Sequence, residues 1–405
     1  MSDRLSFEAA CQFLFARQGN RIKWSMGPTE GLLDLLGHPE RQFPTVHIGG
    51  TNGKGSTTAF TATDLAARGF RVGVYTSPHL VSVRERMMVD GVPIDEDAFA
   101  EWATYLKPHI ERLDASFFEA TTAIALADMA ARGVDIAVVE VGLGGRLDST
   151  NVITPLVSVV TKIALEHTDY LGSDLASIAR EKAGIAKLGV PFVTGERDPA
   201  VQHVLREEAE RRGASRVCLA DTQGASTRPL GLKGVHQHAN AWVALAALNQ
   251  LPPPFGPVGA VWPASFENAY VAGRFEVRGP WIFDVAHNPD GVEVLVTTLR
   301  AYQPARPLHA LVGIRNDKEW RAMLALLAPA VDRLILTVAP SVAPERRWLL
   351  EEVAQWSKTR PGAGDQPDVV WEPDFARALD TVQQGAETML VTGSFHTVGD
   401  ALARL

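Results

Sequence analysis

The sequence predicts an α/β protein with a mostly parallel sheet domain followed by a smaller α/β domain. Two observations predict this class. Short apolar runs alternate with amphipathic helical stretches along most of the 405 residues, a pattern typical of a parallel sheet covered by helices. A glycine-rich turn with one lysine, GGTNGKGST at 49–57, lies between an apolar run and a helical stretch, as in phosphate-binding loops.

The apolar runs give the predicted strands and the domain boundary. In the first part of the chain they lie at 45–48, 71–75, 136–141, 156–161 and 191–194. The segment LPPPFGPVGAVWP at 251–263 is too rich in Pro and Gly for regular structure. Strands resume at 281–284, 309–313, 334–338, 369–371 and 389–392. We therefore predict a domain at 1–262 and a second, Rossmann-like domain at 263–405.

Composition narrows the class of partner. The net charge of −8 gives no overall attraction to nucleic acid or to anionic membranes. Two cysteines, Cys11 and Cys218, are too few for a disulfide framework, and no run of eighteen uncharged apolar residues occurs. We expect a cytoplasmic monomer without nucleic-acid or membrane partners, in which a small anionic substrate needs a local cationic site.

The turn at 49–55 follows the strand at 45–48 and precedes a helix predicted at 56–68, which ends at Gly69. Backbone N–H groups and the helix N-terminus then face an anion, and Lys54 adds a positive charge. The spacing departs from the common phosphate loop, because Ile48 stands where the first glycine would be and Gly55 separates Lys54 from Ser56. From this loop alone, a P-loop-type domain and a tight turn without a ligand both remain open.

Three further stretches carry polar groups at predicted strand ends or on a helix. Glu140 ends an apolar strand before the turn GLGGRLDSTN, where a Mg²⁺ ligand beside a phosphate loop is expected; the alternative is a solvent-facing edge glutamate. His167 follows a strand in EHTDYLG, and a lone histidine is more often structural. Lys182 lies on the helical stretch AREKAGIAK, where an ordinary solvated lysine is the alternative.

With these stretches in view, the sequence resembles the folylpolyglutamate synthase and dihydrofolate synthase family, relatives of the Mur ligases. The shifted phosphate loop is the form that this family uses. The resemblance runs through most of the chain and rests on nine stretches in order: GGTNGKGST, YTSPHL at 75–80, FFEATT at 117–122, VEVGLGGRLDSTN, EHTDYLG, REKAGI, HQHANA at 236–241, AGRFE at 272–276 and DVAHNPDG at 284–291.

The resemblance implies an ATP-dependent ligase. The γ-phosphoryl of ATP passes to a substrate carboxylate, and the amine of L-glutamate attacks the resulting acyl phosphate. Because a carboxylate is a poor electrophile, the protein must supply phosphate positioning and charge neutralisation. The implied acceptors are dihydropteroate and folates. The resemblance favours a bifunctional enzyme that acts on both, and a monofunctional folylpolyglutamate synthase is the alternative.

The resemblance also implies roles for individual residues. ATP phosphates would contact Thr51, Asn52, Gly53, Lys54, Gly55 and Ser56, and the rest of ATP would contact Asn240, Arg274 and Asp284. Two Mg²⁺ sites are implied, one on Ser77 and Glu140 and the other on His167, with Lys182 as the family's carbamylated lysine. Lys54, Lys182 and His167 are the implied catalytic residues. The pterin-bearing substrate would contact Trp24, Ser25, Met26, Gly27, Phe117, Phe118, Glu119, Leu147, Asp148 and Ser149, although one of the two phenylalanines is expected to pack in the core.

Two other classes of function were compared with this one. A sibling Mur-type ligase for a UDP-sugar peptide needs a uridine-binding N-terminal domain, and the phosphate loop already arrives by residue 50. A non-enzymatic nucleotide-binding protein or simple ATPase has no need of Lys54, Ser77, Glu140, His167 and Lys182 together. His287 belongs to the DVAHNPDG stretch, where a structural role and a ligand role are both open.

Overall fold

The computed structural model describes residues 4–18, 25–224, 226, 228–348, 350–358 and 367–405. The chain forms two compact units: unit 1 comprises Met1–Gly231 and Gln237–Ala269, and unit 2 comprises Leu232–His236 and Tyr270–Leu405. The division after Ala269 lies beyond the 262/263 boundary expected from sequence. Phe266 explains the extra length of unit 1, because it packs on Phe60 of this unit at 4.9 Å, as Trp262 just before it packs on Trp242 at 5.0 Å.

Unit 1 contains an eight-stranded sheet with the order β4-β3-β2-β5-β1-β6-β7-β8. The strands from β2 to β8 in this order are parallel, and β3 and β4 add an antiparallel edge. Their bounds are β1 Thr45–Gly49, β2 Val72–Tyr75, β3 Met87–Val89, β4 Val92–Pro93, β5 Ile136–Glu140, β6 Val157–Val160, β7 Pro191–Thr194 and β8 Arg216–Leu219.

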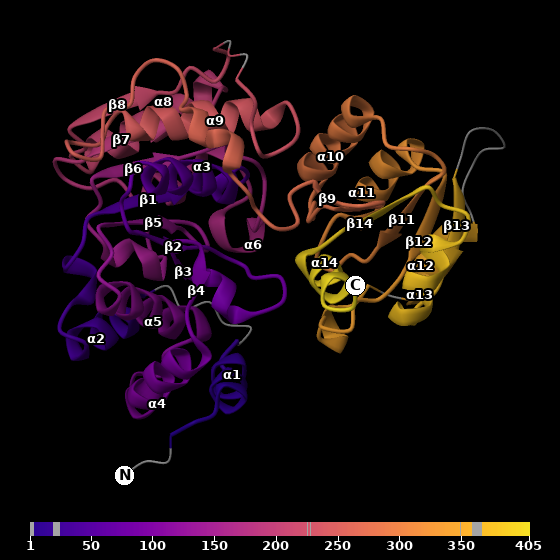
Figure 1. The fold of residues 1–405 in the computed structure, drawn as a ribbon, viewed down its shortest axis with the longest axis horizontal. Helices are drawn as coiled ribbons and strands as arrows, with labels where there is room; N and C mark the ends of the chain where they lie inside the picture. Colours follow the sequence, from indigo (N-terminus) through magenta and orange to yellow (C-terminus); the bar gives the residue numbers. More distant parts are fainter. Residues whose placement is uncertain (1–3, 19–24, 225, 227, 349, 359–366) are drawn as a thin grey trace. The chain divides into compact units, whose positions relative to one another are not determined.

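Nine α-helices accompany this sheet among the described residues (Figure 1). Alternate residues of β5, Ala137 and Val139, enter a core with α1, α2, α4 and α5, while α7 and α8 pack with β6 and β7. The helices are α1 Phe7–Phe15, α2 Gly27–Leu35, α3 Lys54–Ala67, α4 Glu96–Leu113, α5 Phe117–Ala131, α6 Thr168–Leu171, α7 Leu175–Ala183, α8 Pro199–Arg211 and α9 His236–Leu248.

Unit 2 contains a six-stranded sheet with the order β13-β12-β11-β14-β10-β9, parallel except for the edge strand β9. The helices α10 and α11 and a cluster of buried tryptophans pack in its core. The strands are β9 Glu276–Arg278, β10 Trp281–Phe283, β11 Leu308–Val312, β12 Arg333–Leu336, β13 Asp368–Trp371 and β14 Thr388–Thr392. The helices are α10 Pro289–Tyr302, α11 Trp320–Leu327, α12 Leu350–Lys358, α13 Phe375–Gln383 and α14 Phe395–Leu402.

The fold class predicted from sequence is confirmed, with a large mostly parallel sheet and a smaller α/β unit. All ten predicted strands are present within two residues of their expected bounds. The strands β3, β4, β8 and β9 were not predicted, and all four lie at or next to sheet edges. Sequences such as MMV and VP are apolar but too short to stand out as the run of residues that marks a strand buried on both faces.

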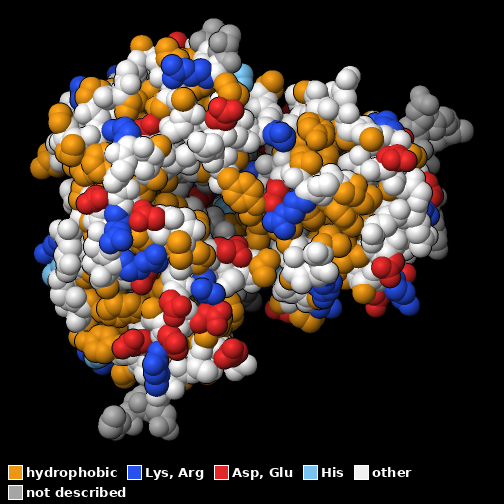
Figure 2. All heavy atoms as spheres, in the orientation of Figure 1, with side chains coloured by type: hydrophobic (Ala, Val, Ile, Leu, Met, Phe, Trp, Pro, Cys, Tyr) orange, Lys and Arg blue, Asp and Glu red, His pale blue; other side chains and the backbone are white. Residues whose placement is uncertain are grey.

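The surface carries mixed charge. Figure 2 shows acidic and basic side chains interspersed on the visible face of each unit, an arrangement that suits ordinary solvation. None of the helices in the described part of the chain is both long enough and apolar enough to cross a membrane.

Candidate active site

The phosphate loop lies between β1 and α3. The helix begins at Lys54, two residues before the predicted start at Ser56, so the sequence prediction of this boundary was wrong. The cause is Gly53, whose φ of 93° lets the chain turn sharply and leaves Lys54 in the first helical turn. The carbonyl of Gly53 accepts the first helical hydrogen bond, from Thr57 N at 2.9 Å. The first backbone amides of α3 therefore follow directly after Lys54 in the chain.

The loop is held by the segment that follows β6. Thr51 N donates to Lys162 O at 2.8 Å, and Thr51 Oγ1 and Ala164 are joined by two further hydrogen bonds. Thr161 Oγ1 donates to Asn52 O at 2.8 Å. Gly50 has a φ of 131°, and a Cβ at this position would collide with Thr161 Oγ1. The loop therefore has a fixed shape that a larger residue at 50 would disrupt.

This shape suits an anion. Lys54 Nζ donates to Thr51 O at 3.1 Å, so its charge lies over the loop, and the helix N-terminus adds the positive end of its dipole. Asn240 of α9 packs against the loop, since a Cβ on Gly53 would collide with Asn240 Oδ1. The structure therefore brings Asn240 to the predicted nucleotide loop, where Asn240 Nδ2 also donates to Gln237 Oε1 at 2.9 Å.

Glu140 lies at the carboxyl end of β5, between β1 and β2, and is buried. The alternative of a solvent-facing edge glutamate is therefore excluded. Ser77 N donates to Glu140 Oε2 at 3.4 Å, and a Cβ on Gly55 would lie 3.8 Å from the same oxygen. A carboxylate, the backbone of Ser77 and the first turn of α3 thus lie next to one another.

Lys182 is buried, with 4% of its surface exposed, so the alternative of a solvated lysine is excluded. Its Nζ donates to Gly50 O at 2.8 Å, directly beneath the phosphate loop. Burial, and secondarily the charge of Lys54, lowers the pKa of Lys182 to about 7. Much of the amine is therefore neutral and nucleophilic near neutral pH.

The glycine turn after β5 allows α7 to approach this closely. A Cβ on Gly145 would lie 2.8 Å from the carbonyl oxygens of Glu181 and Lys182. Arg146 N donates to Glu181 O at 2.9 Å, which ties the turn to the helix end. The glycine turn thus determines how closely the Lys182 side chain approaches the phosphate loop.

His167 is the N-cap residue of α6, with a φ of 53°, and its side chain is 41% exposed. Its Nε2 lies 3.8 Å from Glu166 Oε1, and the charge of Glu166 acts to raise the pKa of Lys182. Glu166 therefore lies close to His167 and is near enough to Lys182 to act on its charge.

The predicted substrate residues divide into several environments. Phe118 is partly buried and packs on Gly142 and on the Tyr75 ring at 6.0 Å. Phe117 is a core residue that stacks on Phe15 at 5.3 Å, as expected for one of the two phenylalanines. Glu119 is buried and closes the α5 capping box, with Ser116 N donating to its Oε2 at 2.6 Å.

The remaining predicted substrate residues lie in two short segments. Asp148 is buried, and burial raises the pKa of its carboxyl; it accepts from Leu143 N at 2.8 Å and from Thr150. Leu147 and Ser149 flank it in the same turn. Ser25, Met26 and Gly27 lie at the start of α2, whereas Trp24 lies outside the described residues.

In unit 2, the predicted residues lie just before β9 and just after β10. Asp284 accepts from Phe275 N and Ala286 N, each at 2.9 Å, and burial raises the pKa of its carboxyl against the opposing charge of Arg274. The guanidinium of Arg274 lies 5.6 Å from the Phe395 ring centre, and the His287 ring lies 5.4 Å from the same ring. Arg274, Asp284 and His287 therefore form one cluster.

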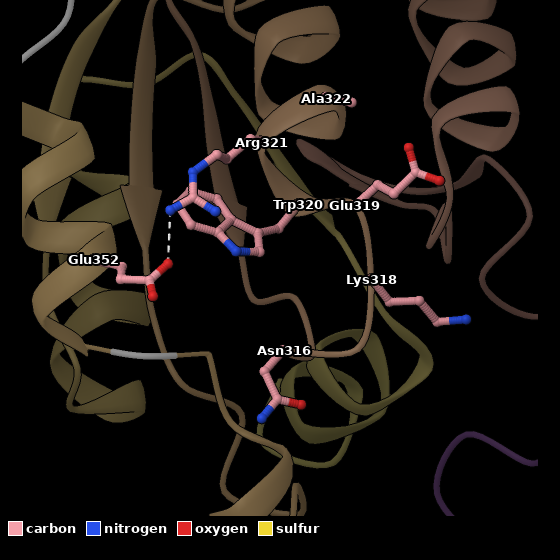
Figure 3. A pocket seen from close by; sticks show the side chains of 7 residues that line it. All are labelled: Asn316, Lys318, Glu319, Trp320, Arg321, Ala322 and Glu352. Carbon is pink, nitrogen blue, oxygen red and sulfur yellow. Dashed lines mark hydrogen bonds and ion pairs between the residues drawn. The ribbon is translucent and has the colours of Figure 1, made fainter. Parts of the chain in front are cut away.

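Unit 2 also has a groove of about 440 Å³ that was not predicted (Figure 3). Arg321 covers the Trp320 ring at 4.1 Å and pairs with Glu352 at 2.6 Å, so the arginine charge is already neutralised. The groove is lined by Asn316, Lys318, Glu319, Trp320, Arg321, Ala322 and Glu352.

Three side chains near the unit 1 site were missed by sequence reasoning. Arg86 is buried beside Phe117, His79 accepts a hydrogen bond from it, and Phe15 stacks on the same phenylalanine. Arg86 lies only nine residues after Ser77 in SPHLVSVRER, but an arginine in a charged run is usually solvated. The position of Arg86 is evident only from the structure, in which the chain turns back beside Thr76 and Thr76 N donates to Arg86 O.

Comparison with known proteins now adds independent evidence. The Mur ligase middle domain matches residues 48–218, and the Mur ligase, glutamate ligase domain matches residues 273–395. Dihydrofolate synthase/folylpolyglutamate synthase of Bacillus subtilis is 30% identical over 99% of this chain and 99% of its own length.

Solved structures agree. Mycobacterium tuberculosis folylpolyglutamate synthase complexed with ADP has a TM-score of 0.86 and 32% identity, covering 98% of each chain. The bifunctional folylpolyglutamate synthase/dihydrofolate synthase of Yersinia pestis, complexed with AMPPNP and Mn ion, has a TM-score of 0.82 and 28% identity, covering 99% of this chain and 98% of that one.

The two domain matches and the geometry of the phosphate loop define a ligase of the Mur type. Such an enzyme uses ATP and forms ADP. The chain belongs to the dihydrofolate synthase/folylpolyglutamate synthase family, whose reaction is the ATP-dependent joining of glutamate to folates.

Proposed function

We propose that the protein adds L-glutamate both to dihydropteroate and to reduced folates, through an acyl phosphate formed from ATP. The names of the Bacillus subtilis and Yersinia pestis proteins, each of which combines both activities, support the bifunctional reading. A protein that carries out the folate step alone is the alternative. Formation of the peptide or amide bond takes place at a carboxylate that phosphorylation has made electrophilic.

The observation that carries this proposal is the meeting of three elements in unit 1. The phosphate loop, the Glu140 carboxylate beside Ser77, and the buried amine of Lys182 beneath Gly50 all lie at the carboxyl ends of β1, β5 and β6. In an open α/β sheet this edge is where ligands bind. We assign ATP phosphates to Thr51–Ser56, with Lys54 neutralising their charge.

A divalent cation fits the donors beside the loop. Mg²⁺ is typically held by one or two carboxylates together with phosphate oxygens, and Glu140 with the Ser77 hydroxyl is a set of this kind. Bound there, Mg²⁺ would supply charge neutralisation for the transferring phosphoryl group. We assign His167 to a second such site, and the Mn ion in the Yersinia pestis complex supports the use of a divalent cation.

Lys182 is a suitable amine for carbamylation. Because its pKa is lowered to about 7, a substantial neutral fraction is available to add CO₂, and the product carbamate is an anion rather than a cation. A carbamate beside His167 would offer oxygen donors, whereas a protonated lysine would repel a metal ion. We propose that the active protein carries this modification.

The residues of the chain would then act in sequence. Lys54 and the loop amides hold the phosphates of ATP, while Phe118 and the turn at 147–149 hold the aromatic part of the acceptor beside Glu140. Attack of the acceptor carboxylate on the γ-phosphorus forms the acyl phosphate and ADP. The amine of glutamate then adds to the acyl carbon and phosphate leaves. Arg274, Asp284 and Asn240 remain assigned to ATP, supported by the resemblance of their stretches.

The test is phosphate release from ATP by the purified protein with L-glutamate, Mg²⁺ and either dihydropteroate or tetrahydrofolate, with products identified by mass. One added glutamyl unit on both acceptors supports the bifunctional ligase, and a product from tetrahydrofolate alone supports the alternative. In Lys54→Ala we expect a loss of at least ~100-fold in turnover, because a positioned charge at the phosphates is lost. Normal turnover by this variant would remove the phosphate-loop assignment.

A further inference from the structure

Arg86 is a buried cation between two groups of residues already described. The residue is only 6% exposed, and its guanidinium lies 5.1 Å from the centre of the Phe117 ring, next to the residues assigned to the acceptor. Glu140, assigned to the metal and phosphate end, acts on its charge. Arg86 therefore lies where the aromatic acceptor and the phosphates of ATP must approach each other.

The surroundings of Arg86 fix its orientation. Nε donates to His79 Nδ1 at 2.7 Å, and the Tyr75 hydroxyl accepts a second hydrogen bond. The ring of Phe117 covers one face of the guanidinium. Since a guanidinium has five N–H donors, three remain beyond these two contacts.

The charges of Glu140 and Glu85 act on Arg86 and favour its protonated form, but neither carboxylate forms an ion pair with it. Glu85, its neighbour in sequence, accepts from the backbone amides of residues 80, 81 and 82 at 2.8, 3.0 and 2.7 Å. Within the described part of the chain, the neighbouring Arg84 forms an ion pair with a different acidic residue, Glu96, at 2.9 Å. Arg86 itself forms no ion pair with an acidic side chain of the described residues. A buried cation without a carboxylate partner is costly unless an anion binds there.

We propose that Arg86 binds the acceptor carboxylate that is to be phosphorylated. This inference rests on the proposed function and adds a specificity residue to it. A carboxylate is planar and receives two parallel N–H bonds from a guanidinium, which both orients it and favours it over a neutral group. Arg86 would thereby hold the attacking oxygen beside Glu140 and reject acceptors whose carboxylate is blocked.

The test compares dihydropteroate with its carboxamide, which keeps the rings and removes the negative charge. Dissociation constants are measured with the purified full-length protein and ATP analogue, for the wild type, Arg86→Gln, Arg86→Lys and Arg84→Gln. Arg84 is the matched control, because it lies two residues away and its pair with Glu96 faces solvent.

We expect the wild type to bind the carboxylate at least ~10-fold more tightly than the carboxamide, as one charge-assisted bidentate contact provides. In Arg86→Gln this ratio should fall to within about twofold, through weaker binding of the carboxylate alone. Arg86→Lys should give an intermediate ratio, because the charge stays and the planar fork is lost. Arg84→Gln should keep the wild-type ratio.

An unchanged ratio in Arg86→Gln overturns the inference, even if both affinities fall, since that pattern indicates a structural role. If Arg86→Gln does not fold, an unchanged ratio in Arg86→Lys has the same meaning. Turnover by the wild type distinguishes a failure of this inference from a failure of the proposed function. Absence of glutamylation of dihydropteroate by the wild type contradicts the proposed function, whereas normal wild-type turnover with an unchanged ratio contradicts the role of Arg86 only.

Discussion

Replacing Lys182 by methionine should stabilise the protein in a way that depends on pH. The pKa of Lys182 is about 7 in the folded state and 10.5 in its ordinary environment. Between these values the unfolded chain binds a proton that the folded chain does not, so the stability of the wild type rises with pH by about 1.4 kcal/mol per unit. Below pH 7 the full cost of burying the ammonium, ~5 kcal/mol, is present; above pH 10.5 it is absent.

Methionine has a similar length, packs in the same space and does not titrate. Urea unfolding of both proteins in CO₂-free buffer at pH 7.5, 8.5 and 9.5 measures the difference, and groups that titrate in both proteins cancel. We expect Lys182→Met to be more stable, with an advantage that shrinks by more than ~1 kcal/mol for each pH unit. Parallel unfolding free energies at the three pH values would refute the reasoning. Ligase activity of the variant should be lost at all of them.

Three further predictions concern other parts of unit 1. Gly53→Ala should raise the KM for ATP at least ~10-fold, because the added Cβ would collide with Asn240. The control is Gly69→Ala, which has a similar φ but no atom within 4 Å of the added Cβ and should cost only ~1 kcal/mol of stability. Equal KM values for the two variants would contradict the role of the collision with Asn240. His47 is buried with a pKa of about 3, so unfolding free energy should fall by about 1.4 kcal/mol per unit as pH drops from 6.5 towards 3, and in urea titrations His47→Gln should lack this slope. Phe117→Ala should lose ~3–5 kcal/mol in the same titrations, whereas Phe118→Ala should mainly raise the KM for the acceptor, and the reverse pattern would exchange their roles.

The central strands were predictable because burial on both faces leaves a clear mark in the sequence. Both strands are buried throughout, as required between two layers of helices: IAVVE of β5 is apolar up to its last residue, and TVHIG of β1 carries Val46 and Ile48. The edge strand β8, RVCL, is half-exposed and short, so no such mark is present. What decides an edge strand is pairing with a neighbour, which a single stretch of sequence does not contain.

The site was predictable where chemistry lies at the end of a strand. Glu140 is the last residue of β5 and the phosphate loop follows β1, and a parallel sheet brings such strand ends together. Contacts across long stretches of chain were not predictable. The burial of Lys182 depends on Gly145, and the position of Arg86 depends on the chain returning beside Thr76. Residue types alone could not distinguish Lys182 or Arg86 from solvated surface charges.

The position of β1 in the sheet has a consequence for how the protein is made. In the described part of the chain, β1 pairs with β5 and β6, which begin at Ile136 and Val157, whereas β1 itself ends at Gly49. During synthesis on the ribosome, more than a hundred further residues must therefore be made before β1 can pair with both neighbouring strands. Until then its apolar side chains remain uncovered. Nascent chains that end before residue 160 should bind no nucleotide and should rely on chaperones, because the threonine that clamps Asn52 has not yet been made.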